Sequence, residues 1–385
     1  MSGSYELKLV DSFNGFKALQ DDWNDLYQKS AHCTVFSSWD WMFTWWEVFH
    51  DQFTRQLFIL CLYDKDELVG IAPFQIDKSY PRSIIQGKTL RFIGSGDAYE
   101  DRIVSQFQDF IVSPRVETIF IKQVSQYLTT HKAKWDFADF EFLLIDALIL
   151  QCFVNSDDVI SRSTYDYGVR FLVRDIESFE CFQSKMGKRW RKMFTKKSRI
   201  LSRDGKVSIK SVNTKESIDA SLKLLADMNC SRWKKKGESC VFESTRFYDF
   251  HQKILHRLVP QGKASIKTLA LGGEPLAAYY IFEDKEQVHY YQSGFYSEYA
   301  NRYSPLFLLV CNEIGEAIKT NKVFDFMYDD SVQSYKKEQY AASHVKMCRL
   351  KWTPQALRLT MFNGAKNIKA MSSYLLASIK NKSVN

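Results

Sequence analysis

The sequence lacks any hydrophobic run long enough to span a lipid bilayer. Its longest apolar stretch near the middle, Phe140–Leu150, contains Glu141 and Asp146, whereas a membrane-spanning helix needs about 20 consecutive apolar residues. The first residues, Met1 to Glu6, also lack the charged-then-apolar pattern of a secretory signal. We therefore expect a soluble, cytoplasmic protein.

Cysteine and histidine follow no spacing that is typical of a disulfide framework or a metal site. The eight cysteines are scattered over 385 residues, no Cys-x-x-Cys occurs, and the nearest consecutive pair is Cys230 and Cys240. His251 and His256 are five residues apart, which would place them on different faces of a helix. We expect free thiols, no metal and no redox cofactor.

Acidic residues are absent from the segment that accounts for the net charge of +8. Lys185 to Arg203 contains nine basic residues and no acidic one, and the rest of the chain is close to neutral. Apolar residues at helical spacing predict an amphipathic helix over residues 184–203, ended by Asp204-Gly205. Its basic face has three interpretations: a solvated outer surface, recognition of a polyanionic donor such as a coenzyme phosphate or an aminoacyl-tRNA, or docking to anionic lipid.

The second half of the chain has a regular order of expected elements. β-Branched and aromatic runs bounded by Gly, Pro and Asp predict strands, followed by a loop, a helix that opens at Ser304-Pro305 and a final strand. Ser304 is expected to accept from the first free backbone N–H groups, which would be presented to an anion such as a coenzyme pyrophosphate. The expected strands are Ala264–Leu271, Leu276–Glu283, Gln287–Ser293 and Val323–Tyr328.

The first half repeats this order. Helices over residues 13–29 and from Trp39 precede strands and a Gly-rich loop, Gly94 to Asp97, and an offset near 206 residues relates the two halves. The offset suggests a duplicated α/β unit. An amphipathic helix over residues 355–380 closes the chain, either packed on the body or in contact with an anionic membrane surface. The remaining expected elements are strands Gln56–Tyr63, Leu68–Ile76, Thr89–Ile93, Phe107–Val112 and Asp139–Ile145, with a helix from Pro114 to Thr130.

Four short motifs stand in order along the chain: Phe36–Trp41, Tyr303-Ser304-Pro305, Phe324-Asp325-Phe326 and Tyr335-Lys336. In this order they resemble motifs of the CelD-like (cellulose-biosynthesis) acetyltransferases of the FemAB/GNAT superfamily. The resemblance covers roughly residues 30–340.

This resemblance implies an α/β fold with two tandem GNAT-like domains, each a mixed, largely antiparallel sheet flanked by helices. We place the acceptor-side domain at residues 1–170, the donor-side domain at 171–354 and the amphipathic helix at 355–385. The implied activity is transfer of an acetyl or other acyl group from acyl-CoA to an amine or hydroxyl of a sugar, polysaccharide or cell-envelope precursor. The alternatives are an aminoacyl-tRNA-dependent FemAB-type transferase and a non-catalytic binding protein of an exopolysaccharide locus.

The resemblance also implies roles for individual residues. Lys336, beside Tyr335, would stabilise the oxyanion that forms at the reacting carbonyl. Asp325 would orient or deprotonate the acceptor, or else pair structurally with a basic neighbour. The donor is expected at Ser304, Arg302 and Lys337. The acceptor is expected at Asp97, Asp101, Trp39 and Trp41, although so many aromatic residues are also typical of a core.

The sequence departs from the family pattern at three places where the acyl donor is expected to bind. Leu306 stands where the family often has glycine, and the loop between Asp325 and Tyr335 is longer and lacks its glycine. The pyrophosphate loop of ordinary GNAT enzymes is absent as well. The sequence therefore leaves the acyl donor open.

Overall fold

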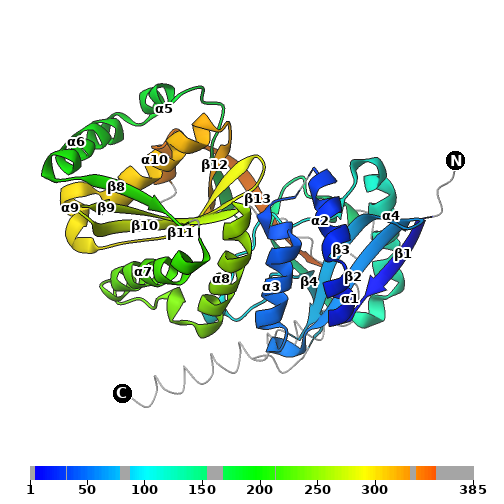
Figure 1. Ribbon diagram of the computed structural model, residues 1–385. Helices are drawn as coiled ribbons and strands as arrows, with labels where there is room; N and C mark the ends of the chain where they lie inside the picture. The colour runs from blue at the N-terminus through cyan, green and yellow to red at the C-terminus, as the bar shows by residue number, and fades with distance from the viewer. Residues whose placement is uncertain are drawn as a thin grey trace, which may run out of the picture.

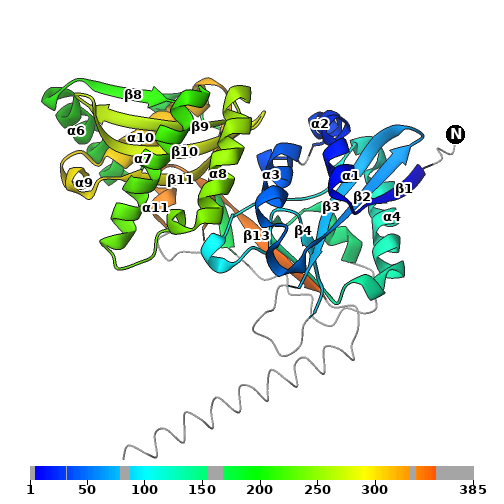
Figure 2. The same ribbon diagram turned by 60° about the horizontal axis from the view of Figure 1, so that its bottom comes forward.

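A computed structural model describes residues 5–352 of this protein, apart from residues 32, 79–86, 154–167, 213 and 330–334. The described chain folds into two lobes that lie side by side (Figures 1 and 2). Within these ranges, no helix is both long and apolar enough to cross a membrane. The expected tail helix over residues 355–380 lies outside the described residues.

The N-terminal lobe contains six strands and four α-helices among its described residues. Helices α1, α2 and α3 cover one face of its strands, and α4 covers the other (Figure 1). The elements are β1 (Tyr5–Val10), α1 (Phe13–Ala18), α2 (Gln20–Lys29), α3 (Trp39–Phe49), β2 (Gln56–Asp64), β3 (Glu67–Asp77), β4 (Thr89–Phe92), β5 (Ile111–Val112), α4 (Glu117–Thr130) and β6 (Phe137–Leu144).

The C-terminal lobe repeats this layered arrangement. Helices α7 and α8 pack on one face of its strands, while α5, α6, α9 and α10 lie on the other (Figure 1). The elements are β7 (Gly168–Val173), α5 (Phe179–Lys185), α6 (Lys188–Asp204), β8 (Val207–Ser211), α7 (Lys215–Lys234), α8 (Thr245–Leu258), β9 (Ala264–Leu271), β10 (Glu274–Glu283), β11 (Gln287–Phe295), α9 (Ser297–Tyr303), α10 (Pro305–Lys319), β12 (Val323–Asp329), α11 (Tyr335–Glu338) and β13 (Ser343–Trp352).

One continuous sheet runs through both lobes. Its strand order is β1-β2-β3-β4-β6-β13-β7-β12-β11-β10-β9-β8, with β5 paired to β3. The β4–β6 and β11–β12 pairs are parallel, and the other pairs are antiparallel. The last strand, β13, therefore pairs with β6 of the first lobe and β7 of the second. This architecture confirms the expected α/β fold with a mixed, largely antiparallel sheet.

The two halves contain the same local arrangement at corresponding positions. A 3-10 turn precedes a serine-capped helix in each half: Ser38 Oγ accepts from Trp41 N at 3.2 Å, and Ser244 Oγ accepts from Phe247 N at 3.0 Å. Such a cap stabilises a helix by about 1 kcal/mol. The caps lie 206 residues apart, which agrees with the offset expected from the sequence.

Several boundaries differ from the sequence-based expectation. Residues 13–29 form two helices rather than one, because the chain breaks at Leu19. The expected strand Phe107–Val112 is reduced to β5, since Phe107 has a φ of 57° that no extended strand accepts. Helix α9 occupies the expected loop before Ser304. Strands β1, β7, β8 and β13 were not expected.

Two chemical expectations are also corrected. Cys230 and Cys240 form a disulfide, so the prediction that all thiols are free is wrong for this pair. Ser304 does precede α10, but it does not cap it. Its backbone is left-handed, with a φ of 49°, and its hydroxyl donates to Ala300 O of the preceding helix at 3.2 Å.

Candidate active site

A cleft of about 860 Å³ lies between the two lobes. It forms where β11 and β12 diverge. The two strands pair in parallel only from Gln287 to His289 and from Val323 to Asp325, while the other edge of β12 pairs with β7 from Phe324 to Asp329. Residues of both diverging ends, 290–292 and 326–328, line the cleft.

An irregularity in β11 shapes this wall. The pairing of β10 with β11 shifts between Tyr280 and Ile281, so Tyr291 is an extra, bulged residue. Bulges redirect side chains and occur beside active sites. Tyr290, Tyr291 and Gln292 therefore all line the cleft, although consecutive residues of a regular strand would point to opposite faces.

The first lobe contributes Asp101 to the opposite wall. The Asp101 carboxylate accepts from Ser244 Oγ at 2.5 Å and from Gln52 Nε2 at 2.7 Å. Because Ser244 belongs to the second lobe, this carboxylate links the two walls. Asp101 is thus placed at the cleft, as its expected acceptor role requires, but its two oxygens already have partners.

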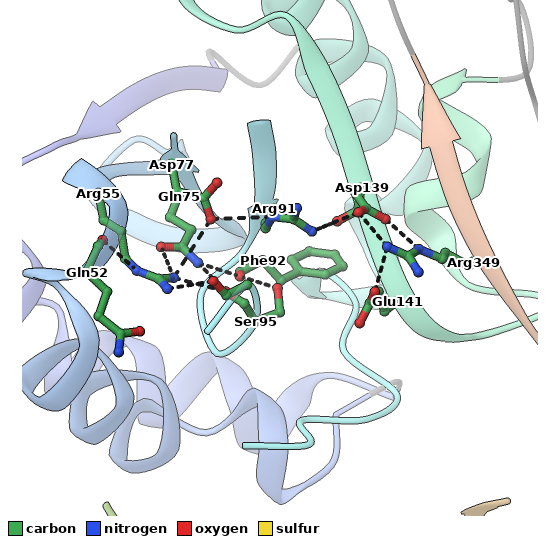
Figure 3. A network of polar contacts seen from close by, with 11 residues as sticks. Gln52, Arg55, Gln75, Asp77, Arg91, Phe92, Ser95, Asp139, Glu141 and Arg349 are labelled. Atoms are coloured by element: carbon green, nitrogen blue, oxygen red, sulfur yellow. Dashed lines mark hydrogen bonds and ion pairs between the residues drawn. The ribbon is translucent and has the colours of Figure 1, made fainter. Parts of the chain in front are cut away.

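The expected Gly-rich loop is held from beneath by buried polar side chains (Figure 3). Arg55 donates to Ser95 O at 3.1 Å and to Gly96 O at 2.7 Å, and Gln75 Nε2 donates to Ser95 O at 2.7 Å. Hydrogen bonds from a charged donor contribute about 1.5–3 kcal/mol each. The loop before Asp97 is therefore fixed in place.

A chain of ion pairs continues from Arg55 across the sheet to β13 (Figure 3). Asp77 lies 3.3 Å from Arg91 Nε, Arg91 lies 2.9 Å from Asp139, and Arg349 of β13 lies 2.6 Å from Asp139. Buried charges are tolerated when each has partners. This network joins the floor of the Gly-rich loop to the strand that connects the lobes.

Asp97 sits behind the cleft wall. Its carboxylate accepts from Ile103 N at 2.5 Å. Burial raises the pKa of Asp97 to about 7, although Arg55 opposes the shift. Asp97 therefore positions the segment that carries Val104, a cleft residue, and does not itself line the cleft.

Asp325 is fully buried next to the point where the strands diverge. Its Oδ2 accepts from Arg170 Nη2 at 3.0 Å and from His289 Nδ1 at 2.8 Å, while His289 Nε2 contacts Asp284 at 2.8 Å. Burial alone would raise the pKa of Asp325, but Arg170 and His289 outweigh it and hold that pKa at about 2. The geometry favours the structural alternative, because the carboxylate is engaged and does not line the cleft.

Lys337, on the short helix α11 that follows β12, lines the cleft. Its Nζ donates to Phe326 O at 3.1 Å. Tyr335 and Lys336 belong to the short helix α11 beside it, but their side chains lie outside the described residues. Lys336 and Tyr335 therefore stay sequence-based predictions.

The start of α10 holds the expected donor residues. The helix begins at Pro305, and no side chain caps its first backbone N–H groups. Arg302, one turn earlier on α9, donates to Asp204 Oδ2 at 2.8 Å and remains exposed. Ser304 and Arg302 thus lie together at a helix N-terminus, the location that the donor prediction requires.

Trp39 and Trp41 do not face the cleft. Both are buried: Trp39 stacks on Phe43 with ring centroids 4.2 Å apart, and Trp41 Nε1 donates to Ser105 Oγ at 2.9 Å. Neither ring lines the cleft. Their expected substrate contact is corrected in favour of the core alternative.

A smaller hollow of about 520 Å³ adjoins the cleft. The two share Tyr99, Ser239, Val241 and Gln292. Sequence reasoning missed this wall and the residues 290–292, because neither the bulge nor the disulfide that positions Cys240 leaves a local pattern. Among the described residues, no group of three or more His, Cys, Asp or Glu side chains is arranged to hold a metal ion.

Part of the second lobe matches a known protein-family model. Residues 188–337 match the model of an acetyltransferase (GNAT) domain. This range includes α6, the diverging strands and the start of α10. No curated protein sequence matches the chain.

Solved structures share the whole architecture at low sequence identity. A structure of FemX has a TM-score of 0.62 and 10% identity, covering 93% of this chain and 100% of its own. The C-terminal domain of a putative lysylphosphatidylglycerol synthetase from Agrobacterium fabrum has a TM-score of 0.52 and 10% identity, with 92% and 97% covered. L-PGS from Bacillus licheniformis has a TM-score of 0.52 and 10% identity, with 90% and 96% covered. These likenesses establish the fold.

Proposed function

We propose that this protein is an acyltransferase that moves an acetyl or other acyl group from acyl-CoA to an amine or hydroxyl in the cleft between its lobes. One observation carries the proposal: the residues that match a GNAT acetyltransferase domain include the diverging strands and the uncapped helix start. The acceptor class that the sequence resemblance implies is a sugar, a polysaccharide or a cell-envelope precursor. Acyl-CoA would supply the activated thioester.

The second lobe offers two features that suit an acyl-CoA. Beyond His289, the edge of β11 that faced β12 has lost its strand partner, so its backbone groups can pair with an extended ligand arm. The first N–H groups of α10, with Arg302 nearby, suit the phosphates. Leu306 in place of glycine limits how closely a phosphate approaches this turn.

The chemical step needs donors for the oxyanion that forms when the acceptor attacks the thioester. One preorganised donor typically contributes about 3 kcal/mol. Lys337 lines the cleft and Lys336 precedes it on α11, so either ammonium group suits this role. Tyr290, Tyr291 and Tyr328 line the same cleft and would exclude water from it.

The first test is titration calorimetry with acetyl-CoA and longer acyl-CoAs. Wild type should bind with micromolar affinity, and Ser304→Tyr should weaken binding at least about tenfold by filling the space at the helix start. Thr320→Tyr, which adds the same bulk at the exposed far end of α10, is the matched control and should bind normally. Absence of binding by wild type would reject acyl-CoA as donor.

A second candidate is transfer from an aminoacyl-tRNA, as in the FemAB-type alternative. The observation that favours it is α6, on which seven basic side chains are exposed: Lys188, Arg189, Arg191, Lys192, Lys196, Arg199 and Arg203. Contacts with a nucleic-acid backbone weaken steeply with salt. Salt-dependent tRNA binding that is lost when Lys192 and Lys196 are changed to Gln would favour this donor over acyl-CoA.

A binding protein without catalysis is the remaining alternative. It would keep the fold and the cleft but turn over no acyl donor. Acyl transfer to any acceptor amine or hydroxyl, dependent on Lys336 or Lys337, would reject it.

A further inference from the structure

We infer that the hollow beside the cleft is a subsite for an anionic group on the acceptor, a carboxylate or a phosphate, and that Arg232 recognises it. This inference rests on the proposed function, because it assigns an acceptor class to the same cleft. Arg232 lies on the last turns of α7 and lines the hollow with Asn229, Trp233, Ser239 and Ser293. No earlier expectation assigned it a role.

The guanidinium of Arg232 is held by aromatic rings. Its Cζ lies 4.6 Å from the centre of the Trp233 ring and 5.7 Å from that of Phe295. Cation–π contacts at these distances hold the guanidinium against the two rings. The side chain is therefore preorganised before a ligand arrives.

Among the residues that the structure describes, none is a polar partner of this guanidinium. Its Nε is buried and makes no hydrogen bond, and no carboxylate of the described chain lies within ion-pair distance of Arg232. Nearby charges pair elsewhere: Lys234 with Glu243 at 2.9 Å, and Lys235 with Glu298 at 3.8 Å. A buried N–H donor without a partner is uncommon in folded proteins, and the remaining guanidinium N–H groups suit a charge-assisted contact with an oxyanion in the hollow.

The position of the hollow links this anion to the acceptor. The hollow shares Tyr99, Ser239 and Gln292 with the cleft, so one ligand can extend from one into the other. Tyr99 comes from the first lobe and is highly exposed, at 86%, which suits a ring that stacks on a ligand across both spaces. The α10 start, where the donor is proposed, is not part of either wall.

Among the described residues, Glu238 is the one acidic side chain in the wall of the hollow, and it forms no ion pair with Arg232. A carboxylate repels a ligand anion. The hollow therefore suits an acceptor that carries a single anionic group, which Arg232 would contact.

The test uses three sugars that differ only in this group: glucose, glucuronate and glucose 6-phosphate. Their binding to wild type, Arg232→Gln and Lys236→Gln is measured by titration calorimetry at constant ionic strength. Lys236 is the matched control, since its Nζ lies 4.7 Å from the same Trp233 ring but it does not line the hollow. We expect glucuronate or glucose 6-phosphate to bind more tightly than glucose, and Arg232→Gln alone to remove the difference, about tenfold.

Three outcomes would overturn the inference: equal binding of all three sugars to wild type, no binding of either anionic sugar, or equal weakening by the two substitutions. Tighter binding of glucuronate would show that the subsite recognises a carboxylate. Tighter binding of glucose 6-phosphate would show that it recognises a phosphate. Acyl-CoA binding, measured separately, should be unchanged in Arg232→Gln. If wild type binds acyl-CoA but does not distinguish the anionic sugars from glucose, the subsite alone is rejected. If wild type distinguishes them but does not bind acyl-CoA, only the proposed donor is rejected.

Discussion

The balance between burial and nearby partners decides whether the fold favours the ionised or the neutral form of Asp97 and Asp325. Asp325 has two cationic partners, which hold its pKa at about 2. Asp97 accepts from Ile103 N, and burial outweighs this bond and the nearby Arg55 and raises its pKa to about 7. The ionised form is therefore favoured by the fold at Asp325 and disfavoured at Asp97.

This contrast predicts that Asp97→Asn stabilises the protein at high pH. A folded-state pKa above the unfolded value of about 4 means that stability is present at low pH and is lost as pH rises through about 7. Asparagine keeps an oxygen to accept from Ile103 N but cannot ionise. The variant should unfold like wild type near pH 4 and be more stable by up to about 4 kcal/mol at pH 8, because each pKa unit corresponds to about 1.4 kcal/mol.

Thermal unfolding of both proteins between pH 4 and pH 8 measures this difference. Asp101→Asn is a useful comparison, because Asp101 accepts from two side chains and its substitution should not stabilise the protein at high pH. Equal melting temperatures of wild type and Asp97→Asn at pH 8 would show that Asp97 is not held in an unfavourable environment when ionised.

At the scale of elements, the segment after α7 connects the cleft to a disulfide. Cys230 lies on α7, and Cys240 lies ten residues later at the edge of the cleft. Ser239 and Val241, on either side of Cys240, line both the cleft and the hollow. The disulfide thus fixes the wall that the two spaces share.

Reduction should therefore destabilise the protein and loosen this wall. Closing a loop of this length stabilises a fold by about 2–3 kcal/mol in the chain-entropy model. Wild type should lose this stability in dithiothreitol, as followed by urea unfolding, while Cys230→Ser should already lack it and respond no further. A wild-type protein that is equally stable with and without the reductant would contradict the role given to this bond.

Local patterns predicted the strands whose partners are neighbours in sequence. β9 has the predicted bounds, and β10 and β11 differ from prediction by two residues at one end, because Gly272-Gly273 and Asp284–Glu286 mark their turns. β13 was missed. Its apolar alternation is broken by a shift between Cys348 and Leu350, and its Arg349 is neutralised by Asp139, which lies 210 residues earlier.

The candidate site was also predictable only in part, because several of its residues are brought together by contacts that no local sequence pattern records. The sequence resemblance predicted an acceptor cleft between the halves with Asp101 in it, and Asp101 lines the cleft. Lys337, which was expected at the donor, lines the same cleft. Trp39 and Trp41 were assigned to the groove because composition alone does not distinguish a core from a wall. Tyr291 was missed because a single bulged residue has no sequence pattern of its own.

At the scale of the whole molecule, the lobes are connected by helices as well as by the sheet. Helices α3 and α8 pack side by side between them (Figures 1 and 2). Arg246 forms two contacts with Asp51, at 2.7 and 2.9 Å, and Arg257 contacts Glu47 at 2.9 Å. One hydrophobic core includes side chains from α1 to α3 and from α7 and α8. The two lobes therefore form a single packed body.

Strand β13 extends this connection, so a change at its end should affect both lobes. Trp352 is buried in the first lobe, with ring centroids 4.8 Å from Trp135 and 5.0 Å from Phe153. Trp352→Ala should cost about 3–5 kcal/mol by leaving a cavity, whereas Lys351→Ala, at an exposed neighbouring position, should cost less than about 0.5 kcal/mol. Because the sheet is continuous from β6 through β13 to β7, calorimetry should show one transition that moves to lower temperature as a whole. Two separate transitions, of which only the first moves, would mean that the lobes unfold independently and that each half carries its stability alone.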